Sequence, residues 1–107
     1  MTTRALINVP KAVKRGEVVE IKAMIGHPME TGYRVGPNGS NIPRDIIRRF
    51  ACTYDGEEVF WADLFPAVSA NPFFAFTLVA TTSGTIEFAW TDGAGKTQTA
   101  SAEITVS

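Results

Sequence analysis

Hydrophobic and polar residues alternate along most of the chain with a period of two, which is typical of β-strands. Five segments show the alternation clearly: Glu17–Gly26, Phe50–Tyr54, Phe73–Ala80, Thr85–Thr91 and Thr97–Val106. Within the second of these, Phe50, Cys52 and Tyr54 share one face. Two further candidates, Ala5–Val9 and Val59–Leu64, bring the expected number of strands to seven.

Turn-forming residues separate these strands. Asp55-Gly56 predicts a tight hairpin, because glycine readily adopts the positive φ that such turns require. The only long irregular region is His27–Arg44, and a long loop in a small domain is a place to expect function. At its end, Pro43–Arg49 has room for one helical turn but not for a long helix.

Seven short, half-buried strands within 107 residues predict an all-β fold. We expect an immunoglobulin-like, two-sheet antiparallel sandwich, formed by residues 1–107 as a single domain. The longest uncharged stretch, Leu64–Ile86, is interrupted by Pro66, Pro72 and several polar residues. We therefore expect no membrane-spanning segment and a soluble protein.

Composition narrows the range of functions. The formal net charge is −1, which argues against non-specific binding of nucleic acid. One cysteine and one histidine leave no basis for a disulfide framework or a multi-cysteine metal site, and we expect no metal and no cofactor. The composition favours a binding or carrier protein over an enzyme.

Charge is distributed unevenly along the chain. Nine of the ten basic residues precede residue 54, whereas seven of the eleven acidic residues follow residue 53. This asymmetry could produce a basic and an acidic face for oriented docking. Alternatively, strands from the two halves intermix in the fold and the charges average out.

The lone thiol and the lone imidazole are the first candidates for chemistry. Cys52 lies between Phe50 and Tyr54 on an apolar strand face, so we interpret it as a small buried hydrophobe, not a nucleophile. His27 opens the irregular region next to Pro28. We expect it to fix the loop by hydrogen bonding or to contact a partner.

Four arginines, Arg34, Arg44, Arg48 and Arg49, form a local basic cluster. Guanidinium groups bind carboxylates and other anions bidentately, so the cluster could serve as an anion contact. The alternative is a solvated strand face balanced by Asp45.

Aromatic residues are concentrated in the middle of the chain. Phe60-Trp61 and Phe73-Phe74 are adjacent pairs, so one member of each pair must face away from the core of the domain. Exposed aromatic side chains often mark a protein interface, although a loop could also cover them. Phe65 belongs to the same concentration, and Met29 adds a soft apolar group of related type.

Four segments together carry a family resemblance: Ile21–Arg34, Ile42–Phe50, Phe65–Phe76 and Gly84–Gly95. The most specific part is His27-Pro28-Met29-Glu30-Thr31-Gly32 followed by Ile42-Pro43-Arg44. In order and spacing the segments resemble the SoxZ family, the smaller subunit of the SoxYZ carrier of bacterial sulfur and thiosulfate oxidation. The resemblance extends from about Ala5 to Val106.

The resemblance implies an immunoglobulin-like sandwich and a non-catalytic role. It also implies a periplasmic protein without its own signal peptide, exported with a SoxY partner in a heterodimer. In this family the sulfur substrate is attached to a cysteine in a Gly-Gly-Cys-Gly-Gly arm of SoxY, whereas Cys52 of this chain is internal. SoxZ would hold SoxY and present its cargo through transient contacts with other sulfur-oxidation enzymes. No motif assigns the anionic cargo to a particular arginine.

The residues expected to contact the partner are drawn from the irregular region, the arginine cluster and the aromatic concentration. They are His27, Met29, Glu30, Arg34, Arg44, Arg48, Arg49, Trp61, Phe65 and Phe73. An exposed aromatic face could also let the isolated chain self-associate. Two other hypotheses remain: a stand-alone sandwich that binds an extracellular ligand, and an enzyme that uses Cys52.

Overall fold

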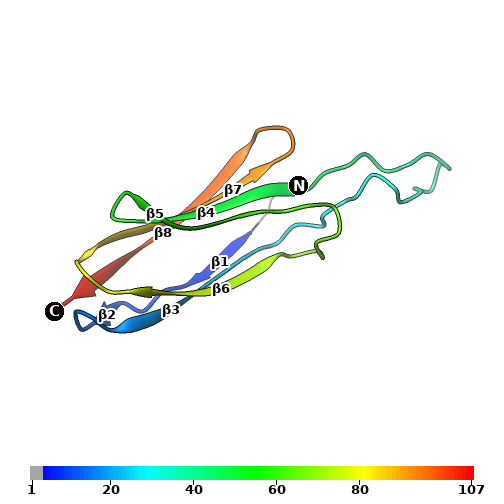
Figure 1. Ribbon diagram of the computed structural model, residues 1–107. Helices are drawn as coiled ribbons and strands as arrows, with labels where there is room; N and C mark the ends of the chain where they lie inside the picture. The colour runs from blue at the N-terminus through cyan, green and yellow to red at the C-terminus, as the bar shows by residue number, and fades with distance from the viewer. Residues whose placement is uncertain (1–3) are drawn as a thin grey trace.

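The computed structural model describes residues 4–107, which form two packed β-sheets and contain no helix (Figure 1). The strands are β1 (Ala5–Asn8), β2 (Ala12–Val13), β3 (Val18–Ile25), β4 (Ile47–Tyr54), β5 (Glu57–Asp63), β6 (Phe73–Val79), β7 (Gly84–Asp92) and β8 (Thr97–Val106). One sheet has the order β1-β3-β6, and the other has the order β2-β8-β7-β4-β5. The predicted all-β, two-sheet sandwich is confirmed.

The seven predicted strands are all present, and β2 is an eighth. Every pairing is antiparallel except that of β2, which runs parallel to the end of β8 through Ala12–Thr105 and Val13–Val106. Two residues are too few to show an alternating pattern, so this short edge strand had no signal in the sequence. The hairpin at Asp55-Gly56 is confirmed, with φ of 52° and 84°.

Aromatic side chains fill the space between the sheets. Phe50 of β4 stacks on Phe74 of β6 with ring centres 4.5 Å apart, and Phe60 of β5 stacks on Phe76 of β6 at 4.4 Å. Trp90 of β7 lies 5.3 Å from Phe50 and is fully buried. The alternation places these rings inward from both sheets, and each such contact adds about 0.5–1.5 kcal/mol beyond its buried area.

The expected helical turn in Pro43–Arg49 is wrong, because β4 already begins at Ile47. Pairing with β7 is irregular between Ile47 and Arg49, where the register shifts at a bulge. A bulge places an extra residue in one strand and breaks the alternation of inward and outward side chains. The buried side chains of Ile47 and Phe50 are therefore three residues apart instead of two.

The molecule is elongated, 58 Å long and about 20 Å across. Figure 1 shows the reason: the chain between β3 and β4 extends far beyond the ends of the sheets. Most of the predicted partner-binding residues belong to this extension or to the strands at its base.

Candidate partner-binding site

The irregular region of the sequence forms an arm, residues 26–46, that leaves the end of β3 and returns into β4 (Figure 1). Two isolated bridges join its two halves, Glu30 with Asp45 and Val35 with Asn41. In the first bridge, the amide of each residue donates to the carbonyl of the other at 2.9 Å. The arm is therefore an irregular hairpin with its own backbone pairing.

Arg44 crosses the arm and holds its outer part. Its Nε donates to the carbonyl of Thr31 at 2.7 Å, and its Nη2 donates to the hydroxyl of Tyr33 at 3.2 Å. The guanidinium also lies 5.4 Å from the centre of the Tyr33 ring. Gly32 between them has a φ of 92°, and a Cβ there would lie 3.2 Å from the Cβ of Arg44. Both the conformation and the close approach require glycine.

Arg34 is occupied by an ion pair within the arm. Its Nε and Nη2 donate to the two carboxylate oxygens of Glu30 at 3.2 and 2.5 Å. The hydrogen bond from Arg34 lowers the pKa of Glu30, and the same bond raises the pKa of Arg34. The charge of Arg34 is therefore balanced locally.

The base of the arm is organised around the buried side chain of His27. Its Nδ1 accepts a hydrogen bond from the amide of Met29 at 3.0 Å, and its Nε2 lies 3.4 Å from a carboxylate oxygen of Asp45. The backbone of His27 forms two more bonds with Asn71, one to the side chain at 3.0 Å and one from the amide at 2.7 Å. The expected loop-fixing role of His27 is confirmed.

Met29 completes this base. It is buried, has a φ of 53°, and its Sδ accepts a hydrogen bond from the amide of Ile47 at 3.3 Å. His27 and Met29 were both expected among the partner contacts. The structure places them beneath the surface, where they position the arm.

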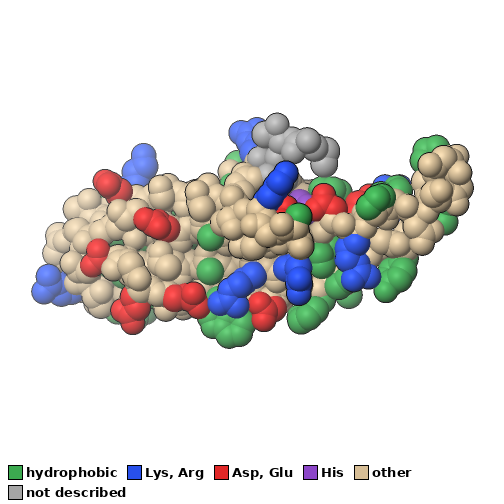
Figure 2. Space-filling view, turned by 90° about the horizontal axis from the view of Figure 1, so that it is seen from above, with side chains coloured by type: hydrophobic (Ala, Val, Ile, Leu, Met, Phe, Trp, Pro, Cys, Tyr) green, Lys and Arg blue, Asp and Glu red, His purple; other side chains and the backbone are tan. Residues whose placement is uncertain are grey.

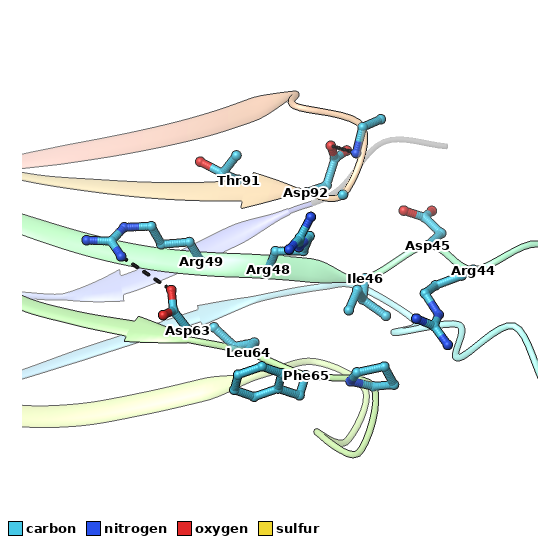
Figure 3. Close-up of a pocket in the computed structure, with 13 residues that line it drawn as sticks. Arg44, Asp45, Ile46, Arg48, Arg49, Asp63, Leu64, Phe65, Thr91 and Asp92 are labelled. Atoms are coloured by element: carbon cyan, nitrogen blue, oxygen red, sulfur yellow. Dashed lines mark hydrogen bonds and ion pairs between the residues drawn. The ribbon is translucent and has the colours of Figure 1, made fainter.

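A groove of about 770 Å³ lies where the arm returns into β4 (Figure 3). Its walls come from three segments of the chain: residues 44–49, residues 63–66, and residues 91–94 at the end of β7 and the start of the β7–β8 turn. The groove brings together Arg44, Arg48 and Arg49 of the predicted arginine cluster, and Phe65 of the aromatic concentration. Arg34 lies outside it, on the arm.

Arg49 contributes to the groove while remaining paired. Its guanidinium lies 3.3 Å from Asp63 and 3.4 Å from Glu58, and 4.7 Å from the centre of the Trp61 ring. Trp61 is the outward-facing member of its aromatic pair, as the alternation predicted. Figure 2 shows the wider setting, with Lys and Arg side chains interspersed with hydrophobic ones along one long edge.

The charge asymmetry of the sequence is partly preserved in space. In Figure 2 most of the acidic side chains in view lie over the half of the molecule away from the arm. The basic cluster lies at the arm and its base.

Phe73 lies elsewhere. It is the outward-facing member of its pair, 58% exposed, on the outer face of the three-stranded sheet. It is in register with Met24, which is itself in register with Leu6, so these three form one row across the sheet. This row and the groove belong to different surfaces.

Several site residues were missed by the sequence analysis. Tyr33 and Val35 are exposed on the arm, and Leu64 and Asp92 line the groove. Asp92 is the last residue of β7, and its Oδ1 accepts the amides of Ala94 and Lys96, both at 2.9 Å. Only the folded sheets bring this end of β7 next to β4, so no local signal could have identified it.

Cys52 does not line the groove and is fully buried. Burial raises the pKa of its thiol to about 12. Within residues 4–107, no group of three or more His, Cys, Asp or Glu side chains is arranged to hold a metal ion. No helix in that part of the chain is long and apolar enough to cross a membrane.

Comparison with protein families finds a match to a family model described as sulphur oxidation protein SoxZ, over residues 7–103. A search of curated proteins finds no match.

Among solved structures, the chain is similar to superoxide reductase (neelaredoxin) from Ignicoccus hospitalis. The TM-score is 0.78 at 20% identity, covering 98% of this chain and 82% of that one. It is also similar to a putative superoxide reductase from Thermotoga maritima, with a TM-score of 0.72 at 22% identity, covering 96% of this chain and 85% of that one. At such low identity these similarities concern the fold alone.

Proposed function

The chain belongs to the SoxZ family of sulphur oxidation proteins, and on this basis we propose that it is the non-catalytic subunit of a periplasmic SoxYZ carrier. In this role it binds a SoxY-type partner in a heterodimer. It also helps to present the partner's cysteine-bound sulfur intermediates to the enzymes that process them. The observation that carries the proposal is the family match over residues 7–103.

The surface at the base of the arm supports a partner-binding role. Trp61 and Phe65 are exposed there beside arginines, and tryptophan, other aromatics and arginine are the residue types enriched at the centres of protein interfaces. The hairpin arm lies next to them and enlarges the surface. We therefore assign the docking of the partner to the groove and the adjoining face of the arm.

The state of Cys52 supports a non-catalytic role. A nucleophilic cysteine needs a thiolate at neutral pH and access to its substrate. Cys52 has neither, because its thiol is buried and its pKa is raised to about 12. The sulfur chemistry is therefore assigned to the partner's cysteine and to the enzymes that act on it.

Two phenylalanines provide a matched test of the docking surface. Phe65 in the groove and Phe73 on the opposite sheet are similarly exposed, at 66% and 58%. We expect Phe65→Ala to weaken binding of SoxY by about tenfold in isothermal titration, since interface aromatics contribute on the order of 1–2 kcal/mol or more. Phe73→Ala should leave the affinity close to that of the wild-type chain.

If Phe73→Ala weakens binding of SoxY and Phe65→Ala does not, the docking surface lies on the three-stranded sheet instead. Absence of any binding between the wild-type chain and SoxY would contradict the proposal. It would favour the alternative of a stand-alone module for an extracellular ligand.

A further inference from the structure

The three arginines of the groove differ in the partners that their guanidinium groups already have within the chain. Arg49 is paired with two carboxylates, Glu58 and Asp63. Arg44 donates to two neutral oxygens, so it is held in place without losing its charge. The side chain of Arg48 has no hydrogen bond or ion pair with any residue in the range 4–107. An exposed guanidinium without a partner in a groove is free to bind an incoming anion.

The backbone and the aliphatic part of the Arg48 side chain nevertheless have defined contacts. Its carbonyl accepts the amide of Leu64 at 2.8 Å, which fixes the backbone at the end of β5. Its side chain lies beside Gly93, where a Cβ would be in ordinary van der Waals contact with the Arg48 Cδ, at 3.5 Å. Figure 3 shows Arg48 between Ile46 and Asp92, whereas Arg49 points away toward Asp63. Arg48 therefore lines the groove with its side chain beside the β7–β8 turn.

The carboxylates of the groove are each engaged with other groups. Asp63 pairs with Arg49, and Asp45 lies 3.4 Å from the buried His27. Asp92 uses its Oδ1 to accept two amides of the β7–β8 turn. Its negative charge still lies near Arg48 and opposes the binding of an anion, which makes Asp92 a useful site for a test.

We infer that Arg48 is the residue that binds the terminal sulfur oxoanion, a sulfonate-type group, on the partner's cysteine. A sulfonate offers three acceptor oxygens, and a guanidinium can donate to two of them at once. The exposed apolar ring of Phe65 lies on the same groove for the uncharged part of the carrier segment. This inference rests on the proposed function, because the cargo reaches the groove only with the partner bound.

The test compares two forms of the whole SoxY partner, one S-sulfonated on its arm cysteine and one blocked there by a neutral carboxamidomethyl group. Isothermal titration gives the ratio of the two dissociation constants. With the wild-type chain, we expect the sulfonated form to bind roughly fivefold more tightly, which is the scale of one exposed charge-assisted contact. Added salt should reduce this preference, because dissolved ions screen the charges in a groove that is open to solvent.

In Arg48→Gln, we expect the preference to disappear, and in Arg48→Lys to be partly retained. Asp92→Asn keeps an oxygen for the two turn amides but removes the opposing charge, so the preference should increase. Arg15→Gln is the matched control. Arg15 is another exposed arginine, in the loop between β2 and β3, and its backbone amide donates to Ser107; the variant should leave the ratio unchanged.

The possible outcomes distinguish failure of the carrier role from failure of the role assigned to Arg48. If the wild-type chain binds neither form of SoxY, the proposed function fails. If it binds both forms with equal affinity, or if Arg48→Gln retains the full preference, the assignment of Arg48 is wrong while the carrier role stands.

Discussion

The interior of the sandwich and the arm are held together by different kinds of interaction. Inside the sandwich, Phe50 contacts five other aromatic rings from both sheets, with ring centres 4.5 to 6.3 Å apart. These contacts are non-directional and involve many partners at once. Loss of any one side chain therefore affects both sheets.

The arm has little apolar interior of its own. Its shape depends on single hydrogen bonds: those of Arg44 across its outer part, the Glu30–Arg34 pair, and His27 at its base. We expect the loss of any one of these to have mainly local consequences. Stability is distributed unevenly in such a chain, and the segments with few buried contacts open first. The comparison predicts global effects for core changes and local effects for arm changes.

The largest expected effect concerns the thiol of Cys52, which reports on opening of the core. Because the side chain is buried and its pKa is raised to about 12, iodoacetamide at pH 8 should not react with it in the closed molecule. We expect alkylation to be slower than in the urea-unfolded chain by a factor on the order of a thousand or more, set by the free energy of global unfolding. Mass spectrometry of timed samples measures the rate. Rapid alkylation of the folded protein would contradict this picture and reopen the interpretation of Cys52 as a nucleophile.

The second prediction removes the central ring of the core. We expect Phe50→Ala to lower the free energy of unfolding by about 3–5 kcal/mol, because it leaves a cavity between the sheets. Urea denaturation measures the change. Trp61→Ala is the control: it removes an exposed aromatic on the neighbouring strand and should cost well under half as much. Equal losses from the two variants would show that the interior is not the main source of stability.

The same contrast explains what the sequence could predict. The strands were predictable because one buried face repeats a period of two, as in the alternation of Ile86, Phe88 and Trp90 with less buried residues. The exceptions were β2, which is too short for a pattern, and the start of β4, where the bulge next to Arg48 breaks the pattern.

The candidate site was predictable only in part. Arg44, Arg48 and Arg49 stand close together in the sequence, and the structure keeps them in one groove. The remaining walls come from distant segments that meet only through sheet pairing, so neither Asp92 nor the separation of Phe73 from the groove had a local signal. The burial of Met29 likewise depends on a positive φ and a contact with Ile47 eighteen residues away.

The third prediction breaks the arm at its base. We expect His27→Ala to leave the buried amide of Met29 without an acceptor, at a cost of about 1–3 kcal/mol. Hydrogen exchange should accelerate in the amides of residues 29–45 more than in β7. His27→Asn offers an oxygen close to the position of Nδ1 and should restore part of the protection. Uniform acceleration across both sheets would mean that the base of the arm belongs to the cooperative core.

The smallest expected effect concerns the ion pair on the arm. Because Arg34 lowers the pKa of Glu30 below its ordinary value of 4.5, the pair favours the folded arm at any pH above that value. The contribution is lost as the pH falls below 4.5 and through the lowered pKa of the folded state. NMR titration of the Glu30 carboxyl carbon should give a midpoint below 4.5, and Arg34→Gln should raise it toward the ordinary value. Arg15→Gln, a remote arginine variant, should leave it unchanged.

In the same titration, the amide of Ile42, which donates to the carbonyl of Arg34, should lose protection before any amide of β7 does. If the Glu30 midpoint does not respond to Arg34→Gln, the ion pair does not contribute to the arm, and the other hydrogen bonds of the arm maintain its shape without it.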